Sequence, residues 1–309
     1  MHHLFSSIRY IDGTERKYIN MKLSVFVVTY NQEQYIQQCL DSIVMQQTNF
    51  DYEVIIGEDC STDNTFQICE EYAKKYPFVK VYHHPKNLGL VKNWEFVLNH
   101  CSGEYVAMIE GDDYWTNPKK LQTQVDYLEK HKDIALTFTS AQVAYEGGDV
   151  HDEHIFDHLA TRTYSLEEIY EKWSILSSTV VFRKSPVFPI SYPKEIYIND
   201  TFTFMRIMQY GLAYCFAEQW TTYRRHASNL SRVDTPEASL RWAIQHRYIC
   251  RCFPKLKQLA QHNESIYLEA LIYDRQSEDT WRHRMRYMWL NKQLLFSRFA
   301  LATIKYFFV

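Results

Sequence analysis

The chain has 309 residues, of which 46% are hydrophobic and 16% aromatic, so it can bury a substantial core in one large domain or two modest ones. Its formal net charge of −3 argues against general nucleic-acid binding. The seven cysteines are scattered without CxxC spacing, which is typical of reduced core residues in a cytosolic protein. We find neither a secretory signal nor an apolar run of the ~20 residues that a spanning helix needs, and we therefore expect a cytoplasmic protein.

The first half of the chain alternates apolar strands with amphipathic helices. Residues 1–20 show no clean periodicity and are expected to form a floppy arm. The apolar pattern predicts strands at 23–30, 53–57, 79–82 and 106–109, and helices at 34–45, after residue 63 and around 93–100. Asn31 is expected to cap the first helix. Strands joined by crossover helices predict an α/β fold with a parallel sheet that helices cover on both faces.

Polar residues follow each of these four strands. They occupy residues 29–31, 58–63, 86–89 and 110–113. Because ligands of parallel sheets lie at the carboxyl ends of the strands, these segments are expected to meet at one rim and to form a nucleotide-and-metal site.

The acidic cluster after the fourth strand points to a divalent cation. Glu110, Asp112 and Asp113 follow a buried strand within four residues, and like charges this close disfavour joint ionisation. A hard cation such as Mg²⁺ takes carboxylate oxygens and leaves positions open for phosphates. The alternative is a solvated acidic turn before the helix that Pro118 begins. The chain has no GxGxxG or GxxxxGK[ST] loop, so phosphate charge would have to be met by a metal.

The segments VFVVTYNQEQYI, VIIGEDCSTDNT, NLGLVKN and MIEGDDYWTNPKKL, in this order and spacing, resemble the nucleotide-sugar-binding half of family 2 glycosyltransferases. The resemblance covers residues 23–121, with weaker matches to 231. It implies the GT-A fold, with a mainly parallel central sheet, a catalytic domain at 21–235 and a C-terminal helical region at 236–309. Within the catalytic domain, 21–121 would bind the nucleotide sugar and 122–235 the acceptor.

The resemblance also implies roles for individual residues. Thr29 and Tyr30 would line the base and Asp59 would take the base edge. The full donor-binding set is Thr29, Tyr30, Asn31, Glu58, Asp59, Asn87, Gly89, Glu110 and Asp112. The metal, Mn²⁺ or Mg²⁺, would be held by Asp112, Asp113 and His226. Glu stands at position 110 where Asp is commoner, which leaves open whether Glu110 touches the metal or the ribose.

The second half supplies the expected catalytic base. Asp200 lies at a predicted helix start, where the simple interpretation is an N-terminal carboxylate favoured by the helix dipole. Inverting members of the family carry an ED pair there, and its Asp deprotonates the acceptor hydroxyl. Asn199 and Asp200 occupy that place here, so Asp200 is expected to be the base. Ser177 and Ser178, in a predicted strand at 177–183, are candidates for the acceptor side, and Arg224 or Arg225 for a phosphate contact.

Two further segments leave alternatives open. A polar loop at 147–162 could bind zinc or remain solvated, and its spacing fits no standard zinc pattern; the residues concerned are Asp149, His151, Asp152, His154, Asp157 and His158. Residues 281–309 are basic and aromatic with no Asp or Glu, which suits an amphipathic helix on an anionic membrane, or a helix packed on its own domain.

These observations predict an inverting glycosyltransferase of the hexosyltransferase type. It would move a sugar from a nucleotide-sugar donor, expected to be UDP-linked, to a saccharide or lipid-linked acceptor, as relatives that build bacterial surface polysaccharides do. It would work in the cytoplasm or at the inner face of the membrane. A sugar-nucleotide nucleotidyltransferase is an alternative, although TYNQEQY is not its usual Gly-rich basic loop. A non-catalytic nucleotide-sugar-binding module is the other.

Overall fold

The computed structural model describes residues 21–145, 150–151, 156, 158–184, 187–226 and 236–273. The arm at 1–20 and the basic segment at 281–309 lie outside the described residues. The chain divides into two compact units. The first holds the described residues up to Tyr192 together with Asn199–His226, and the second holds Pro193–Ile198 and the described residues from 236 onward.

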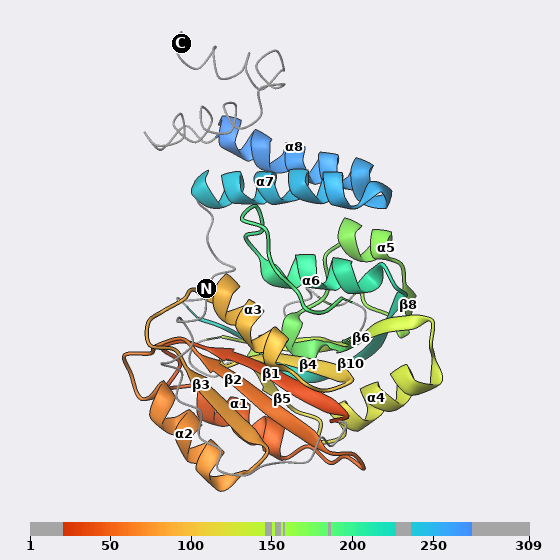
Figure 1. The fold of residues 1–309 in the computed structure, drawn as a ribbon. Helices are drawn as coiled ribbons and strands as arrows, with labels where there is room; N and C mark the ends of the chain where they lie inside the picture. Colours follow the sequence, from red (N-terminus) through yellow and green to blue (C-terminus); the bar gives the residue numbers. More distant parts are fainter. Residues whose placement is uncertain are drawn as a thin grey trace. The chain divides into compact units, whose positions relative to one another are not determined.

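One mostly parallel sheet forms the centre of the first unit (Figure 1). Its strand order is β3-β2-β1-β4-β9-β6-β10-β5, with β7 paired to β6 and β8 to β10. The strands are β1 Leu23–Thr29, β2 Tyr52–Glu58, β3 Val79–His83, β4 Tyr105–Glu110, β5 Tyr114–Trp115, β6 Ile134–Tyr145, β7 Val150–His151, β8 Arg162–Tyr164, β9 Val181–Arg183 and β10 Leu212–Arg225. β1 to β4 are mutually parallel, and β9 runs antiparallel to β4 and β6. The predicted α/β class and parallel sheet are confirmed.

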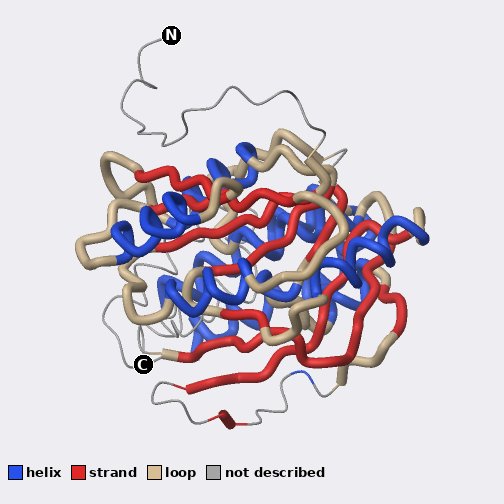
Figure 2. The backbone as a smooth tube through the Cα atoms, turned by 90° about the horizontal axis from the view of Figure 1, so that it is seen from below, coloured by secondary structure: helices blue, strands red, loops and turns tan. Residues whose placement is uncertain are grey.

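Helices cover both faces of this sheet (Figures 1 and 2). The helices of the first unit are α1 Ile36–Val44, α2 Thr65–Lys75, α3 Leu90–His100, α4 Lys120–Lys130, α5 Leu166–Glu171 and α6 Asn199–Met208. Apolar residues of α1, α2 and α4 share one core with the sheet. On the opposite face α3 packs against β1 and β2, with the rings of Phe26 and Trp94 4.7 Å apart.

One predicted strand is wrong in part. Residues 177–183 were expected to be extended, but the segment Ser177–Thr179 forms a 3₁₀ turn, η2, and only Val181–Arg183 is a strand. The carbonyl of Ser178 accepts the indole N–H of Trp115 at 2.7 Å and the hydroxyl of Thr221 at 3.3 Å. These long-range contacts favour the turn over the strand that the local sequence favours.

The second unit is a helical pair, α7 Pro236–Cys252 and α8 Lys257–Tyr273, joined by the 3₁₀ turn Pro254–Leu256. The rings of Trp242 and Tyr267 stack 5.6 Å apart, and His246 lies 5.4 Å from Tyr267. Gln245 accepts the backbone N–H groups of Tyr197 and Ile198, which ties residues 193–198 to α7. Within the described part of the chain no helix is both long and apolar enough to cross a membrane.

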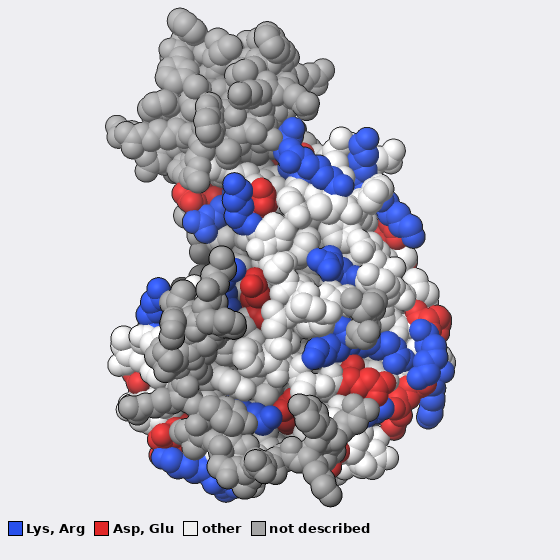
Figure 3. Space-filling view, in the orientation of Figure 1, with Lys and Arg blue, Asp and Glu red and all other residues white. Residues whose placement is uncertain are grey.

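Acidic and basic side chains are intermixed on the face of the described residues that Figure 3 shows. No broad field of one sign is visible there, in keeping with the small net charge of −3.

Candidate active site

Strand register brings polar residues from four strands to one edge of the sheet. Thr29 of β1 pairs with Glu58 of β2, and Glu58 pairs with His83 of β3. On the other side of β1, Val28 pairs with Glu110 of β4. This is the carboxyl edge of the parallel strands, where ligands of such sheets bind.

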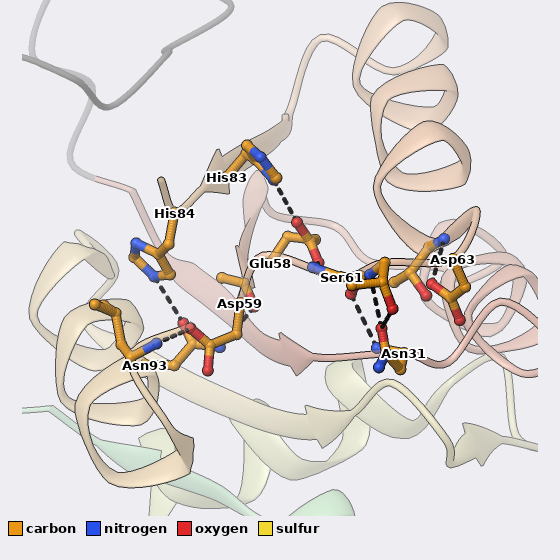
Figure 4. Close-up of polar contacts among 12 residues, drawn as sticks. Asn31, Glu58, Asp59, Ser61, Asp63, His83, His84 and Asn93 are labelled. Carbon is orange, nitrogen blue, oxygen red and sulfur yellow. Dashed lines mark hydrogen bonds and ion pairs between the residues drawn. The ribbon is translucent and has the colours of Figure 1, made fainter. Parts of the chain in front are cut away.

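Glu58 lies inside this rim and binds the loops around it (Figure 4). Its side chain is fully buried, and one carboxylate oxygen accepts the N–H of Ser61 at 2.8 Å. The other oxygen lies 2.5 Å from Nδ1 of His83. Glu58 therefore joins the ends of β2 and β3. His83 was not among the residues expected from the sequence, although its place at the end of a predicted strand was a signal.

Asp59 fixes the loop that follows β3. Its two carboxylate oxygens accept the N–H groups of Leu88 and Gly89 at 2.7 and 2.9 Å, and its own N–H donates to the carbonyl of Thr29 at 3.1 Å. Burial raises the pKa of Asp59 above its ordinary value. Asn87 accepts the same Gly89 N–H at 3.0 Å, and Gly89 has a φ of +82°, a conformation that glycine adopts without strain. The predicted residues of these loops therefore lie together.

The end of β1 presents one exposed ring. Thr29 is 3% exposed and its hydroxyl donates to Gln32 at 2.8 Å, whereas Tyr30 is 44% exposed. Asn31 has a left-handed backbone with φ of 51°. That conformation turns its side chain away from α1, and its Oδ1 accepts the N–H of Thr62 at 2.8 Å. The expectation that Asn31 caps the first helix is wrong, because it caps the approach to α2.

The turn Glu110–Asp113, called the carboxylate turn, lies directly against the end of β1. A Cβ on Gly111 would lie 2.4 Å from Oε1 of Gln32 and 2.8 Å from Oγ1 of Thr29. Only glycine permits this approach without displacing the neighbouring side chains. The glycine between Glu110 and Asp112 therefore brings the acidic turn to the same rim as the β1 and β2 loops.

The three carboxylates of this turn are buried to different extents. Asp113 is 1% exposed and Asp112 9%. Burial, with the charges of Asp112 and Asp113, raises the pKa of Glu110 well above its ordinary value, and Asp200 adds to the effect. Burial and Asp112 likewise raise the pKa of Asp113. Close carboxylates cannot all ionise easily without a compensating positive charge.

His226 lies directly on this turn. Its Nε2 is 3.0 Å from Oδ2 of Asp112, and its ring stacks on that of Tyr35 with centroids 4.9 Å apart. The structure thus brings together two of the three residues expected to hold a metal. Asp113 points inward from them, and its Oδ1 accepts the backbone N–H of Arg224 at 3.0 Å.

Arg224 is held by protein groups. Its guanidinium lies between the rings of Tyr35 and Tyr114, 5.1 and 4.7 Å from their centroids. It also donates to the backbone carbonyl of Asp112 and to the side chain of Gln38. The guanidinium therefore ties α1 to the carboxylate turn and supplies positive charge beside it.

The chemistry of the turn suits a divalent cation. Carboxylate oxygens and an imidazole nitrogen are ligands that Mg²⁺ and Mn²⁺ accept. Oδ2 of Asp113 and Oγ of Ser178 are buried without a hydrogen-bond partner, a condition that calls for an ion or a water. Within the described ranges, no three His, Cys, Asp or Glu side chains are already gathered as metal ligands. The residues fit a cation by their chemistry, without a ready-made cage.

Asp200 is the second titratable group of interest at this edge. It occupies the first turn of α6, and its carboxylate accepts the hydroxyl of Thr201 at 3.1 Å and the backbone N–H of the same residue. Burial raises the pKa of Asp200 to about 6. The neighbouring Asn199 is 1% exposed; its Nδ2 donates to the carbonyl of Val91 at 3.4 Å, and its Oδ1 has no partner.

The serines of η2 lie close to the carboxylate turn. The hydroxyl of Ser177 lowers the pKa of Glu110 against the effect of burial. Both serines are buried, at 5% and 0% exposure. This placement is closer to a support for the carboxylates than to the acceptor-facing position expected from the sequence.

The histidine-rich loop at 147–162 lies largely outside the described residues. Of its candidate ligands, His158 is described, and its Nε2 lies 2.5 Å from the hydroxyl of Ser174. No contact in the described part of this loop tests the zinc alternative, which stays a prediction.

Comparison with known proteins decides the family. The family model for glycosyl transferase family 2 matches residues 24–187, more than half of the chain. The chain belongs to glycosyl transferase family 2. An uncharacterized protein of Mycobacterium tuberculosis is 36% identical over 210 residues, which span 67% of this chain and 60% of that protein. The chain thus spans less than two thirds of the length of this relative.

Solved structures of glycosyltransferases share the fold. TarS of Staphylococcus aureus, crystallised as residues 1–349 with UDP-GlcNAc, aligns with a TM-score of 0.59 and 22% identity over 92% of this chain and 88% of that one. A mannosyltransferase of Pyrobaculum calidifontis with GDP-Man and Mn²⁺ aligns with a TM-score of 0.56 and 15% identity over 93% and 84%. The GT-A fold expected from the sequence is confirmed.

Proposed function

We propose that this family 2 protein transfers one sugar, with inversion, from a nucleotide-sugar donor to a saccharide acceptor. The observation that carries the proposal is the position of Asp200, a carboxylate with a pKa near neutrality on the same edge of the sheet as the buried carboxylate turn. A nucleotide-binding module without turnover would have no use for a base there. Family membership supports the same conclusion.

The nucleoside would bind along the ends of β1 and β2. Tyr30 offers an exposed ring next to the buried Thr29, whose carbonyl accepts the N–H of Asp59, and the carboxylate of Asp59 holds the following loop in place. Glu58, Asn87 and Gly89 hold the surrounding backbone. We propose uracil as the base because the structural relative from S. aureus binds UDP-GlcNAc.

The diphosphate would lie over the carboxylate turn. We propose Asp112 and His226 as metal ligands, because they already face each other at 3.0 Å. Oδ2 of Asp113 is the third candidate, since it is the acidic oxygen without a hydrogen-bond partner. Glu110 would hold either the metal or the ribose. When bound, Mn²⁺ or Mg²⁺ supplies positive charge that offsets the charge growing on the leaving nucleoside diphosphate.

Asp200 would act as the general base. A sugar hydroxyl is a weak nucleophile, and a positioned carboxylate that takes its proton contributes about 10² to 10⁴ in rate. The acceptor oxygen forms a bond to the anomeric carbon as the bond from that carbon to the diphosphate oxygen breaks. The proton passes to Asp200 and the electron pair leaves with the diphosphate. Attack opposite the leaving group inverts the anomeric centre.

The name of one relative supports a proposal for the class of acceptor. The TarS protein is named a poly(ribitol-phosphate) β-N-acetylglucosaminyltransferase, and 36% of residues are identical over 118 positions, 38% of this chain and 20% of that protein. We propose a role in polysaccharide biosynthesis with a saccharide or lipid-linked saccharide acceptor. We further propose a cytoplasmic location, with residues 281–309 contacting the inner face of the membrane.

Replacement of the base tests this function. Asp200→Asn keeps the size of the side chain and removes its basicity, so turnover should fall by about 10² to 10⁴ while UDP binding is retained. Asp133→Asn, an exposed acid in the same unit, is the matched control and should leave turnover unchanged. Equal turnover by Asp200→Asn and wild type would remove the assignment of Asp200.

A further inference from the structure

The loops after β1 and β2 cap each other. Three successive backbone N–H groups of the first loop donate to side chains of the second: Asn31 to Ser61 at 2.9 Å, Gln32 to Thr65 at 2.8 Å and Glu33 to Asp63 at 3.1 Å. We call residues 31–33 and 61–65 together the clasp. These donors precede α1, whose N-cap is Tyr35.

The exchange is reciprocal. The backbone N–H groups of Thr62 and Asn64 donate to the side chains of Asn31 and Glu33 at 2.8 and 2.9 Å. The amide of Asn64 adds a second bond to the same Glu33 oxygen at 2.7 Å. Asp63 also accepts the N–H of Thr65 at 3.0 Å, so one carboxylate serves both loops. Each loop thus supplies side-chain acceptors for backbone N–H groups of the other.

The titration of Asp63 agrees with this role. Burial alone would raise the pKa of Asp63, but the hydrogen bonds from Thr65 and Glu33 lower it below its ordinary value. Hydrogen bonds to the charged form have this effect. The ionised carboxylate is therefore the form that the clasp requires.

Backbone strain gathers at the same place. Among the described residues, Asn31 and Cys60 are the non-glycine residues with positive φ, at 51° and 62°. Such conformations are uncommon for non-glycine residues and persist where surrounding contacts determine them. Asn31 belongs to the clasp and Cys60 borders it, and the residues just before them are Tyr30 and Asp59.

We propose that Asn31 and Asp63 are positioning residues whose clasp preorganises the nucleoside rim. By holding the residue after Tyr30 and the loop after Asp59, the clasp keeps both nucleoside-facing groups in place before ligand arrives. Asn31 then acts through the β2 loop and not by touching the base. The identity of the ligand as a nucleoside diphosphate rests on the proposed function, whereas the cross-loop coupling does not.

Hydrogen exchange on the protein without ligand tests the coupling. Asn31→Gly tolerates the left-handed backbone and removes the side chain, so exchange of the amides at 61–65 should speed up by about tenfold. Asp63→Ala should speed up exchange at 31–33 in the same way. Asn31→Asp keeps Oδ1 as an acceptor and should restore wild-type exchange at 61–65. Unchanged exchange at 61–65 in Asn31→Gly would overturn the clasp.

Calorimetric titration with UDP in the presence of Mn²⁺ and steady-state kinetics form the second arm. Asp63→Ala should weaken UDP binding by about tenfold and raise KM with little change in kcat, because binding is weakened equally in ground and transition states. Asn31→Asp should bind UDP within about threefold of wild type. If Asn31→Gly weakened UDP binding while exchange at 61–65 stayed unchanged, Asn31 would be a direct contact and the proposal would be wrong. Absence of UDP binding by the wild type would contradict the proposed function and leave the exchange data to decide the clasp.

Discussion

The site rim has a nucleoside side, formed by the loops after β1 and β2, and a carboxylate side, formed by Glu110–Asp113 and the neighbouring η2 turn and β10. The two sides differ in how their buried polar groups are hydrogen-bonded. On the nucleoside side, the carboxylates of Glu58 and Asp59 both accept backbone N–H groups, and Asn31 completes the clasp. Three of the five buried side-chain atoms that lack a hydrogen-bond partner in the described ranges lie on the carboxylate side, namely Asp113 Oδ2, Ser178 Oγ and Thr222 Oγ1. The other two, Asn199 Oδ1 and Trp94 Nε1, belong to α6 and α3.

The nucleoside side is therefore preformed, whereas the carboxylate side has buried polar atoms that a ligand would satisfy. A buried polar atom without a partner costs about 1 to 3 kcal/mol, so the carboxylate side holds its shape at the expense of stability. The raised pKa values of Glu110 and Asp113 agree with this, because buried neighbouring carboxylates ionise less easily. We infer that the nucleoside side is complete before ligand binds, whereas the carboxylate side is completed by cation, water or acceptor.

The largest expected effect comes from the metal-facing carboxylate. Asp112→Asn removes one charge beside His226, and we expect the Mn²⁺-dependent part of UDP binding to weaken by about 100-fold or more. Titration calorimetry with and without Mn²⁺ measures this. Asp51→Asn, at an exposed position ahead of β2, is the control. If Asp112→Asn kept the full Mn²⁺ effect, the carboxylate side would not be the metal site.

The pH profile gives an effect of intermediate size. The pKa of Asp200 is raised to about 6, and the base form predominates only above that value. The initial-rate kcat/KM should therefore level off above about pH 6 and fall about tenfold per pH unit below it. A profile that stays flat down to pH 5 would contradict the role of Asp200, as would an unchanged acid limb in the residual activity of Asp200→Asn.

The smallest effect concerns stability alone. Lys120 is fully buried; its ammonium donates to Gln124 at 2.7 Å and lies 4.6 Å from the ring centroid of Trp115. In the described part of the chain no carboxylate pairs with it. Burial lowers the pKa of Lys120 well below its ordinary value, so Lys120→Met should raise the free energy of unfolding at pH 7 by about 1 to 3 kcal/mol.

Urea unfolding over a pH series measures this gain. Because the folded protein disfavours the charged amine, wild-type stability should rise from the lowered pKa toward about pH 10.4, and Lys120→Met should lack this rise. Lys120→Arg, which keeps the charge, is the opposing variant and should destabilise. A Lys120→Met protein less stable than wild type would show that the buried charge is compensated in the folded protein.

Much of the fold was predictable because continuous apolar runs in the local sequence mark most of its longer strands. Leu23–Thr29 is buried along its whole length, so its continuous apolar run identifies it, and β6 begins and ends where its apolar pattern does. The two-residue strands β5 and β7 carry no such pattern and form only because a partner strand pairs with them. The turn at Ser177–Thr179 was missed because contacts from distant residues determine it.

The sequence predicted which residues lie at the site but not the contacts that they make. The strand-end rule and the family motifs identified Asp59, Asp112 and Asp200 as rim residues, and their functional roles stay predictions. The motifs gave no indication that Asn31 turns toward the β2 loop or that Asp113 binds the backbone of Arg224. Those contacts depend on φ at one residue and on the placement of a strand more than a hundred residues away, which single-sequence patterns do not encode.

The most direct test of the proposed function is calorimetric binding of UDP-, GDP- and dTDP-sugars to the folded protein, each with and without Mn²⁺. We expect one UDP-sugar to bind tightly and only with the metal present, and circular dichroism should verify that the protein is folded. No binding of any donor to the folded protein would contradict the assignment of this rim as a nucleotide-sugar site.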